Sequence, residues 1–556
     1  MVVQELEKLI EATIVQIYGI NYTTKLVVPK NLFGGQRFYA SNISFRLSEQ
    51  LKKSPADISC EIASALPQHR YIDAVEAANG YINILLSKVA IADIVCRLHD
   101  IDNLASSDVN AGKAIALEFV SANPTGPLSV VNGRAAAIGS SLANILETTG
   151  ASVTTRYYIN DNPESGQLVA LKNTLDYYDK VNQGEQVEFP EDGYKGEFIK
   201  SVWKKYHAFH AVGDIAFGAV AVNYIIQCQQ ADLDALGVYF DSFDRESVYM
   251  KGWTLDRLFS GFGVNLSDFT YIKDGATWLK TSEYGDSKDR VIIRADGRPT
   301  YFHNDIIYHA VKYYRSRNAD SNVQLINIFG ADHHGYIDRL NAVMRMWGLS
   351  DITVLLTQMV SLETTDENGV TSAYIGSKRE GQYLHLKEDF IDRVGCDAAR
   401  WYFLSETLTA HLKINVDKAT EQNMSNPVFY VQYAHARFAQ ILSKASTLGI
   451  TLDGHFANLY LLNESEAAVQ LILKLNEYES VVASAAEKLS PHVIKTYLYE
   501  LAQLAHKYYA SGRLIEQAYE ECLAGLYLVT TTNKVLKHGL GLLGISAPLA
   551  MVALDE

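Results

Sequence analysis

Two adjacent histidines, His333 and His334, stand where a ligand site is expected. They follow the apolar run LINIFGA from Leu325, which suits a buried parallel strand, and ligands bind at the carboxyl ends of strands in open parallel sheets. We therefore expect the pair to line a ligand site, with one imidazole capping the next helix as the open alternative. Metal binding by the pair is disfavoured because adjacent side chains diverge and no third ligand is evident.

Three further polar residues could hold a buried cation. Tyr301 and Asp305 are four residues apart, so they share one face if they begin a helix. Glu118 adds a carboxylate within the apolar run AIALEFV. Burying a fixed cation without paired acceptors costs several kcal/mol, so a cation site needs such carboxylates. Taken singly, each residue is more often a helix cap or a solvated surface group.

Length and composition indicate a folded protein of several domains. Single cores stop growing at roughly 250 to 300 residues, so a chain of 556 residues predicts two or three domains. Hydrophobic residues make up 48% and charged residues 20%, which excludes the disordered and membrane classes. The net charge of -15 argues against a basic coat over the whole surface, although a local basic groove remains open.

Cysteine usage and the N-terminus predict a cytoplasmic location. The five cysteines lie far apart without metal-ligand spacing, so neither disulfides nor structural zinc are expected. The opening MVVQELEKLIEATIVQIYGI carries acidic residues and apolar positions at helical spacing, which favours an amphipathic helix over a secretory signal. No apolar run approaches the roughly 20 residues of a membrane span.

The pattern of elements changes along the chain. Residues 1 to about 105 alternate helical patterns with short strands such as YINILLS from Tyr81, as in a small α+β module. The run AIALEFV, a helix from about Asn132 to Leu146, and the runs VIIRA and LINIFGA predict a parallel sheet with helical crossovers. The stretch from Asn160 to about Ser247 suits a helical insertion. Strand signals vanish after about Ala410, where a helical bundle is expected.

Five segments in order resemble those of the arginyl-tRNA synthetases, a class I family. The segment EFVSANPTGPLSVVNGR, from Glu118 to Arg134, resembles the segment that contains the family's HIGH signature. The other four begin at Trp278 (WLKTSEYGDSKDR), Gly330 (GADHHGYIDRL), Gly376 (GSKREGQ) and Asn426 (NPVFYVQYAHARF). The likeness extends to GLGLLGISAP near the C-terminus and covers essentially the whole chain.

This resemblance implies a multidomain α/β fold with three parts. Residues 1–105 would form an N-terminal α+β domain that contacts tRNA, and residues 106–410 a Rossmann-like, parallel-sheet catalytic domain with insertions. Residues 411–556 would form a C-terminal all-helical anticodon-binding bundle. The implied partners are arginine, tRNA(Arg) and ATP with Mg²⁺, with no tightly bound metal and no membrane, and a monomer is expected.

The resemblance also assigns roles to single residues. The family's arginine-binding positions are occupied by Glu118, Asn123, Tyr301 and Asp305. The implied ATP-binding residues are Val131, Gly133, His333, His334, Gly376, Ser377 and Lys378. The implied catalytic residues are Ser129, Asn132, Lys378 and Arg379. The implied tRNA-binding residues are Tyr430, Tyr433, His435 and Arg437.

Both signatures that activate ATP in this family are altered. The HIGH positions read Ser129, Val130, Val131 and Asn132. Serine and asparagine can still donate hydrogen bonds, but Val131 places a branched side chain where the family leaves room for adenine. In the KMSKR positions, from Ile375 to Arg379, isoleucine replaces the first lysine. Each lost donor to a developing oxyanion typically costs about 100 to 1,000-fold in rate.

The segment YVQYAHARF places aromatic and basic side chains together on helical faces. Exposed aromatics beside basic groups suit stacking on unpaired anticodon bases. For Tyr430, packing in the bundle core is an equally weighted alternative.

Three functions fit these residues. The leading hypothesis is an arginine–tRNA ligase. A catalytically impaired paralogue that binds arginine or tRNA as a regulator is the alternative, and an enzyme that activates another small molecule is the third. Fold does not separate them, since sites decide function.

Overall fold

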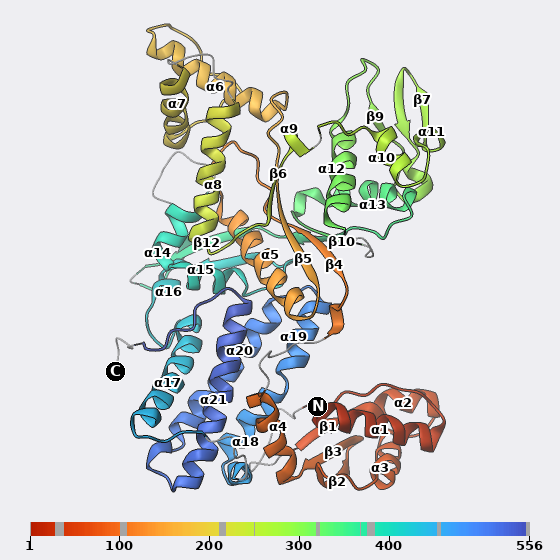
Figure 1. Cartoon of the computed structure of the whole chain (residues 1–556), viewed down its shortest axis with the longest axis vertical. Coiled ribbons are helices and arrows are strands. Elements are labelled where there is room, and N and C mark those ends of the chain that lie inside the picture. The colour runs from red at the N-terminus through yellow and green to blue at the C-terminus, as the bar shows by residue number, and fades with distance from the viewer. Residues whose placement is uncertain are drawn as a thin grey trace.

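The computed structural model describes residues 2–27, 38–100, 108–210, 218–249, 251–317, 323–366, 368–374, 384–452 and 458–551. The chain forms an N-terminal module, a central sheet with two insertions, and a helical bundle beneath the sheet (Figure 1). No helix in these described ranges is long and apolar enough to cross a membrane.

The N-terminal module packs helices on a small antiparallel sheet. Its strands, in the order β1-β3-β2, are β1 (Phe38–Ser41), β2 (Ile72–Ala78) and β3 (Tyr81–Leu86). Its helices are α1 (Val2–Tyr18), α2 (Ile43–Leu51), α3 (Pro55–Ala65) and α4 (Lys88–Asp100). The apolar spacing of α1 buries Leu6, Ile10 and Ile14 completely, so the predicted amphipathic helix and α+β module are confirmed.

A five-stranded parallel sheet forms the centre of the molecule. Its order is β11-β10-β4-β5-β6, with β4 (Ala114–Glu118) in the middle. The other strands are β5 (Ser152–Ile159), β6 (Ser242–Arg245), β10 (Val323–Gly330) and β11 (Thr353–Thr357). Every residue of β4 is buried, which explains its continuous apolar run. Helix α5 (Val130–Thr148) crosses from β4 to β5. The predicted multidomain α/β fold with a Rossmann-like sheet is confirmed.

Two insertions flank this sheet (Figure 1). One contains α6 (Gly166–Asn182), α7 (Glu197–His210) and α8 (Asn223–Ala235). The other contains α9 (Glu246–Tyr249), α10 (Leu255–Gly261), α11 (Leu266–Phe269), β7 (Thr270–Lys273), β8 (Ala276–Leu279) and β9 (Arg290–Ile293). The prediction that the run VIIRA belongs to the parallel sheet is therefore wrong, since it forms β9 of the antiparallel sheet β7-β8-β9. Its strand is half-buried on an insertion, and an apolar run alone does not reveal its partner strands.

Helices α12 (Tyr301–Ser316) and α13 (Ile337–Met346) follow the second insertion and flank β10. A further sheet has the order β13-β12-β14, formed by β12 (Val360–Thr365), β13 (Thr371–Ala373) and β14 (Leu412–Asn415). Strand β14 lies beyond Ala410, where only helices were predicted, because four residues are too short to give a clear pattern. The short helices α14 (Asp392–Val394), α15 (Cys396–Phe403) and α16 (Val416–Thr420) pack nearby.

The C-terminal region is an all-helical bundle, as predicted. It consists of α17 (Pro427–Thr447), α18 (Glu466–Asn476), α19 (Tyr478–Glu487), α20 (His492–Ala510) and α21 (Tyr519–Leu542). The N-terminal module packs on this bundle through buried polar contacts, since Asn476 Nδ2 donates to the Tyr39 hydroxyl at 3.1 Å. Arg97 forms an ion pair with Glu479 at 2.8 Å across the same interface.

Candidate active site

The site lies at the carboxyl ends of β4 and β10. Strands β5 and β6 continue the sheet on one side of β4, while β10 and β11 lie on the other side. The strand order therefore reverses between β4 and β10, and open α/β sheets bind ligands at this switch point. Glu118, the last residue of β4, is in register with Asn327 of β10. Both residues accept hydrogen bonds from the same lysine, Lys312.

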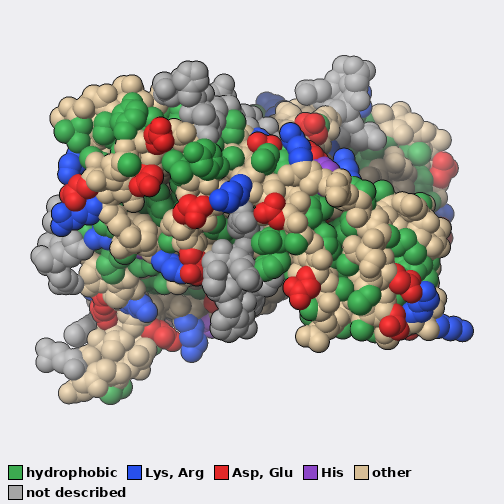
Figure 2. Space-filling view, turned by 90° about the horizontal axis from the view of Figure 1, so that it is seen from below, with side chains coloured by type: hydrophobic (Ala, Val, Ile, Leu, Met, Phe, Trp, Pro, Cys, Tyr) green, Lys and Arg blue, Asp and Glu red, His purple; other side chains and the backbone are tan. Residues whose placement is uncertain are grey.

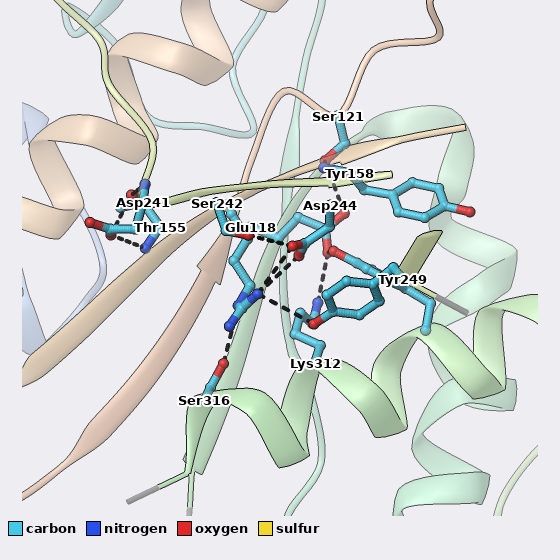
Figure 3. A network of polar contacts seen from close by, with 12 residues as sticks. Glu118, Ser121, Thr155, Tyr158, Asp241, Ser242, Asp244, Tyr249, Lys312 and Ser316 are labelled. Carbon is cyan, nitrogen blue, oxygen red and sulfur yellow. Dashed lines mark hydrogen bonds and ion pairs between the residues drawn. The ribbon is translucent and has the colours of Figure 1, made fainter. Parts of the chain in front are cut away.

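Glu118 is a buried carboxylate with an internal counter-ion. Its Oε2 accepts from Lys312 Nζ at 2.7 Å and from the Tyr308 hydroxyl at 3.0 Å, while Ser121 donates to Oε1 at 3.0 Å (Figure 3). Glu118 is 3% exposed and Lys312 is fully buried. Burial raises the pKa of Glu118, but Lys312 and the other donors outweigh it and leave the pKa below its usual value. Glu118 is therefore an ion-paired anion.

Hydrogen bonds hold the side chain of Lys312, on α12, against strands β4 and β10. Lys312 Nζ also donates to Asn327 Oδ1 at 2.7 Å, and Asn327 Nδ2 donates to His309 Nε2 at 3.0 Å. The other ring nitrogen, His309 Nδ1, donates to the Asp305 carbonyl at 2.8 Å. Burial, reinforced by Lys312, lowers the pKa of His309 to about 3, so its ring is neutral. These hydrogen bonds together restrict the position of the Lys312 ammonium group.

A second buried pair lies beside the first. Arg156 on β5 contacts both carboxylate oxygens of Asp244 on β6 at 3.1 and 3.2 Å (Figure 3). Its guanidinium also donates to the Tyr249 hydroxyl at 3.3 Å and to Ser316 Oγ at 3.1 Å. Arg156 is 5% exposed and Asp244 is 2% exposed, so this pair is as internal as that of Glu118 and Lys312.

Two more carboxylates form no ion pair among the described residues. Glu246, at the start of α9, is 8% exposed and accepts from Tyr158 at 2.6 Å and Asn304 at 3.0 Å. Asp305, one turn into α12, is half-buried. Burial, with repulsion from Glu246 and then Glu118, raises the pKa of Asp305 to about 7 against the opposing attraction of Arg339. These two acids share one electrostatic environment that favours a positive ligand.

The balance of charges defines what the pocket can bind. Lys312 and Arg156 neutralise Glu118 and Asp244, which leaves Glu246 and Asp305 to bind a cation. The predicted site therefore gains Glu246, which sequence reasoning missed. Its signal was an acidic residue directly after the short strand SFDR, within a stretch interpreted as a helical insertion.

Lys312 was missed as well. It lies seven residues after Asp305 in the apolar stretch of α12, so it shares that face of the helix. The sequence signal for Lys312 was a single lysine among apolar residues, seven positions after Asp305 on the same predicted helix.

The structure places the other predicted arginine-binding residues at the rim. Tyr301 is the first residue of α12 and is 61% exposed. Asn123 is exposed on the loop after β4, where its carbonyl accepts from Gln229 Nε2 at 3.0 Å. Glu118 and Asp305 thus lie close enough to repel each other, while Tyr301 and Asn123 make no hydrogen bond to either carboxylate among the described residues.

The N-terminus of α5 is closed by its own side chains. Ser129 Oγ accepts from the Asn132 backbone NH at 3.3 Å, and Asn132 Oδ1 accepts from the Ser129 NH at 2.9 Å and the Ser129 hydroxyl at 2.7 Å. This reciprocal capping box satisfies donors that a helix start otherwise offers to an anion. The Ser129 hydroxyl is therefore bonded to Asn132, whose side chain takes part in the box through its acceptor oxygen.

The remaining predicted ATP-binding residues are only partly visible. Val131 is half-buried on the first turn of α5, while Gly133 is buried where a side chain would collide with Leu386. His333 and His334 lie in a 3₁₀ turn after β10, as predicted, but their side chains lie outside the described residues. The positions of the second signature also lie outside the described residues: Ile375, Gly376, Ser377, Lys378 and Arg379.

The aromatic residues predicted to bind tRNA lie on α17. Tyr433 and His435 are only 6% and 1% exposed, so the expected exposure of these rings is wrong. His435 Nδ1 contacts the Pro548 carbonyl at 2.9 Å, and Tyr433 stacks on Phe429. They are buried because α17 packs on α20, α21 and the C-terminal segment. Tyr430 is half-buried against His506, which matches the alternative of core packing.

A basic cavity lies beside Arg437 in the bundle. It has a volume of about 530 Å³ and is lined by Arg437, Lys444, Tyr509 and Arg513, among others. The Arg437 guanidinium lies over the rings of Tyr433 and Tyr509, at 4.3 and 4.7 Å from their centroids. Tyr509 is 41% exposed, unlike the aromatics predicted from α17. This cavity combines positive charge with an accessible ring.

Family models match both ends of the chain. The "Arginyl tRNA synthetase N terminal domain" matches residues 4–86, and the "DALR anticodon binding domain" matches residues 431–551. A curated arginine–tRNA ligase of Listeria monocytogenes is 37% identical, covering 98% of this chain and 98% of its own length. One of Staphylococcus aureus is 34% identical over 95% of this chain and 94% of its own length.

Solved structures share the fold. Arginyl-tRNA synthetase of Thermus thermophilus superposes with a TM-score of 0.72 at 21% identity, covering 99% of this chain and 100% of its own. Methionyl-tRNA synthetase of Mycobacterium tuberculosis gives a TM-score of 0.51 at 11% identity, with 78% of this chain and 92% of its own covered.

Proposed function

Because this chain belongs to the arginyl-tRNA synthetase family, we propose that it is an arginine–tRNA ligase, which forms arginyl-adenylate from arginine and ATP and transfers arginine to tRNA(Arg). The observation that carries the proposal is the pair Glu246 and Asp305, neither of which forms an ion pair with a cation among the described residues. A bound guanidinium would supply the missing positive charge. Its planar fork of donors suits two carboxylates better than the single ammonium of lysine.

The reaction requires positioning more than covalent participation. An oxygen of the arginine carboxylate attacks the α-phosphorus of ATP, and the bond to pyrophosphate breaks. The terminal ribose hydroxyl of tRNA then attacks the carbonyl carbon of the adenylate, loses its proton and releases AMP. The pocket orients arginine by its side chain, so that its carboxylate faces the ATP site near the start of α5. ATP would enter as its Mg²⁺ complex, and Mg²⁺ would neutralise phosphate charge.

The bundle would bind the anticodon loop of tRNA(Arg). Figure 2 shows acidic and basic side chains interspersed on the face seen from below, rather than one continuous basic surface. With a net charge of -15, attraction to RNA must therefore be local. The cavity at Arg437, Lys444, Tyr509 and Arg513 supplies such a place, where an unpaired base could stack on Tyr509. The RNA-contact prediction moves accordingly from Tyr433 and His435 to this cavity.

Two assays test the proposal on the full chain. Charging of tRNA(Arg) with radiolabelled arginine, and arginine-dependent exchange of pyrophosphate into ATP in the presence of tRNA, should both exceed the rates with lysine. Arginine binding without either reaction would favour the impaired paralogue, to which the closed capping box on α5 also points. Turnover with another amino acid but not with arginine would favour a redirected enzyme.

A further inference from the structure

The segment before α5 pairs with a segment that lies far away in the sequence. The Leu386 NH donates to the Leu128 carbonyl at 2.8 Å, and the Val130 NH donates to the Leu384 carbonyl at 3.1 Å. Between these bonds, Ser129 and His385 form an antiparallel bridge. In such a non-hydrogen-bonded pair the two Cα atoms are about 4.5 Å apart and the side chains share one face. A histidine thus lies directly opposite the first altered position of the HIGH motif.

The packing around this bridge fixes the position of His385. Leu128, beside Ser129, and Leu386, beside His385, are both fully buried. Gly133 allows the approach, because any side chain there would collide with Leu386. The His385 NH donates to Asp389 Oδ2 at 2.9 Å, which anchors the backbone from the other side. The pairing is therefore a built part of the fold rather than a loose contact.

Several donors at the start of α5 are already bonded within the protein. Ser129 and Asn132 bond to each other, and the Val130 NH is bound by the Leu384 carbonyl. A donor from another segment would therefore strengthen the binding of a phosphate group at the start of α5. An imidazole can donate from either nitrogen, and carries positive charge when protonated. The His385 side chain is 17% exposed, so it is held in place yet reachable.

We propose that His385 supplies the phosphate-contacting imidazole at the start of α5 during adenylate formation, in the place left by Ser129. This inference rests on the proposed function, since that function puts ATP at the carboxyl edge of the sheet. The phosphate donor would then come from His385 instead of Ser129, the residue opposite it in the bridge, and the phosphate site would stay in the same place. One charged neighbour, the Glu388 carboxylate at 3.9 Å from His385 Nδ1, is half exposed.

The experiment compares variants of the full chain by ATP kinetics and by calorimetric binding of a non-hydrolysable ATP analogue. His385→Ala should lower kcat/KM for ATP at least tenfold and weaken analogue binding, as expected for one lost phosphate donor. His385→Asn keeps a donor and should lose less. His411→Ala, at an exposed histidine that contacts Ser361, is the matched control and should match the starting protein. Adding Ser129→His to His385→Ala should recover most of the loss, because the two positions share one face.

The outcomes separate the inference from the proposed function. If the starting protein charges tRNA(Arg) and His385→Ala stays within about twofold of it in both measurements, His385 has no phosphate role and the ligase assignment stands. If no charging occurs, calorimetric binding of the ATP analogue still tests the role of His385. A contact between His385 and phosphate must appear as weaker analogue binding in His385→Ala. Absence of analogue binding to the starting protein would overturn the inference. Thermal unfolding of each variant identifies misfolding, and His385→Asn then serves as the test.

Discussion

The two ends of the loop between β4 and α5 differ in how their polar groups are used. At Glu118 the pocket is complete, because two internal cations neutralise two carboxylates and two further acids remain for a ligand. Eleven residues later, at Ser129, both the NH and the hydroxyl of this residue are bonded within the capping box of the helix. One end is prepared for a substrate, whereas the other has serine and asparagine in place of the two histidines of the family's motif. Amino-acid recognition and ATP activation can therefore weaken independently in this fold.

The largest effect should follow from breaking the internal ion pair. Lys312→Met leaves Glu118 as an uncompensated buried charge, which typically costs about 3 to 5 kcal/mol of unfolding free energy. The midpoint of thermal unfolding should fall accordingly. Adding Glu118→Gln should recover part of the loss, because a neutral amide costs less to bury. Lys200→Met, at a surface lysine paired with Glu197, is the control. An unchanged midpoint would show that the pocket does not depend on this pair.

Arginine recognition should depend next on Asp305. Asp305→Asn keeps the shape but removes one of the two free carboxylates, so arginine affinity should fall by about 2 to 5 kcal/mol. Calorimetry with tRNA and an ATP analogue present measures this change. Asp296→Asn, at a surface acid paired with Arg298, should bind arginine like the starting protein. Equal affinity for arginine and lysine in the starting protein would remove the contrast between the two ends.

Restoring the HIGH motif should strengthen the weaker end. The triple change Ser129→His, Val131→Gly and Asn132→His should raise tRNA-dependent ATP turnover by at least about tenfold, since one donor is worth roughly 2.7 to 4 kcal/mol. Single reversions should do less. Loss of the capping box should cost about 1 kcal/mol of stability at the same time. With His385 already acting, most of the gain would come from Val131→Gly and Asn132→His. If the unchanged protein charges tRNA at an ordinary rate and the triple change does not raise ATP turnover, the altered HIGH motif does not impair function.

A smaller effect concerns pH. Because the pKa of Asp305 is raised to about 7, arginine must bind the ionised form that dominates only above this pH. Affinity should rise about tenfold between pH 6 and pH 8, and Asp305→Asn should abolish the rise. In the ligand-free protein the sign is opposite. The folded state holds the proton more tightly between pH 3.8 and about 7, so this group makes stability fall as pH increases through that range. Arginine titrations and thermal unfolding at both pH values measure the two trends.

Much of the fold could be predicted from local pattern. The run AIALEFV became β4, the run LINIFGA became β10, and the spacing of Tyr301 and Asp305 correctly placed both on one helix. Errors occurred where elements are short or their partners lie on insertions, as for β9 and β14. In the bundle, aromatic spacing on α17 could not tell a face that binds RNA from one buried under α20 and α21.

The sequence by itself determined the altered signatures and the supply of carboxylates, because both are matters of residue type at a position. Tertiary structure alone decided which charges remain free. Glu118 is neutralised by a lysine 194 residues away, and Glu246 joins the pocket through Asn304, 58 residues away. The same holds for His385, which meets Ser129 only through strand pairing. Electrostatic pairing acts through space over a few ångströms, so no local pattern along the chain contains it.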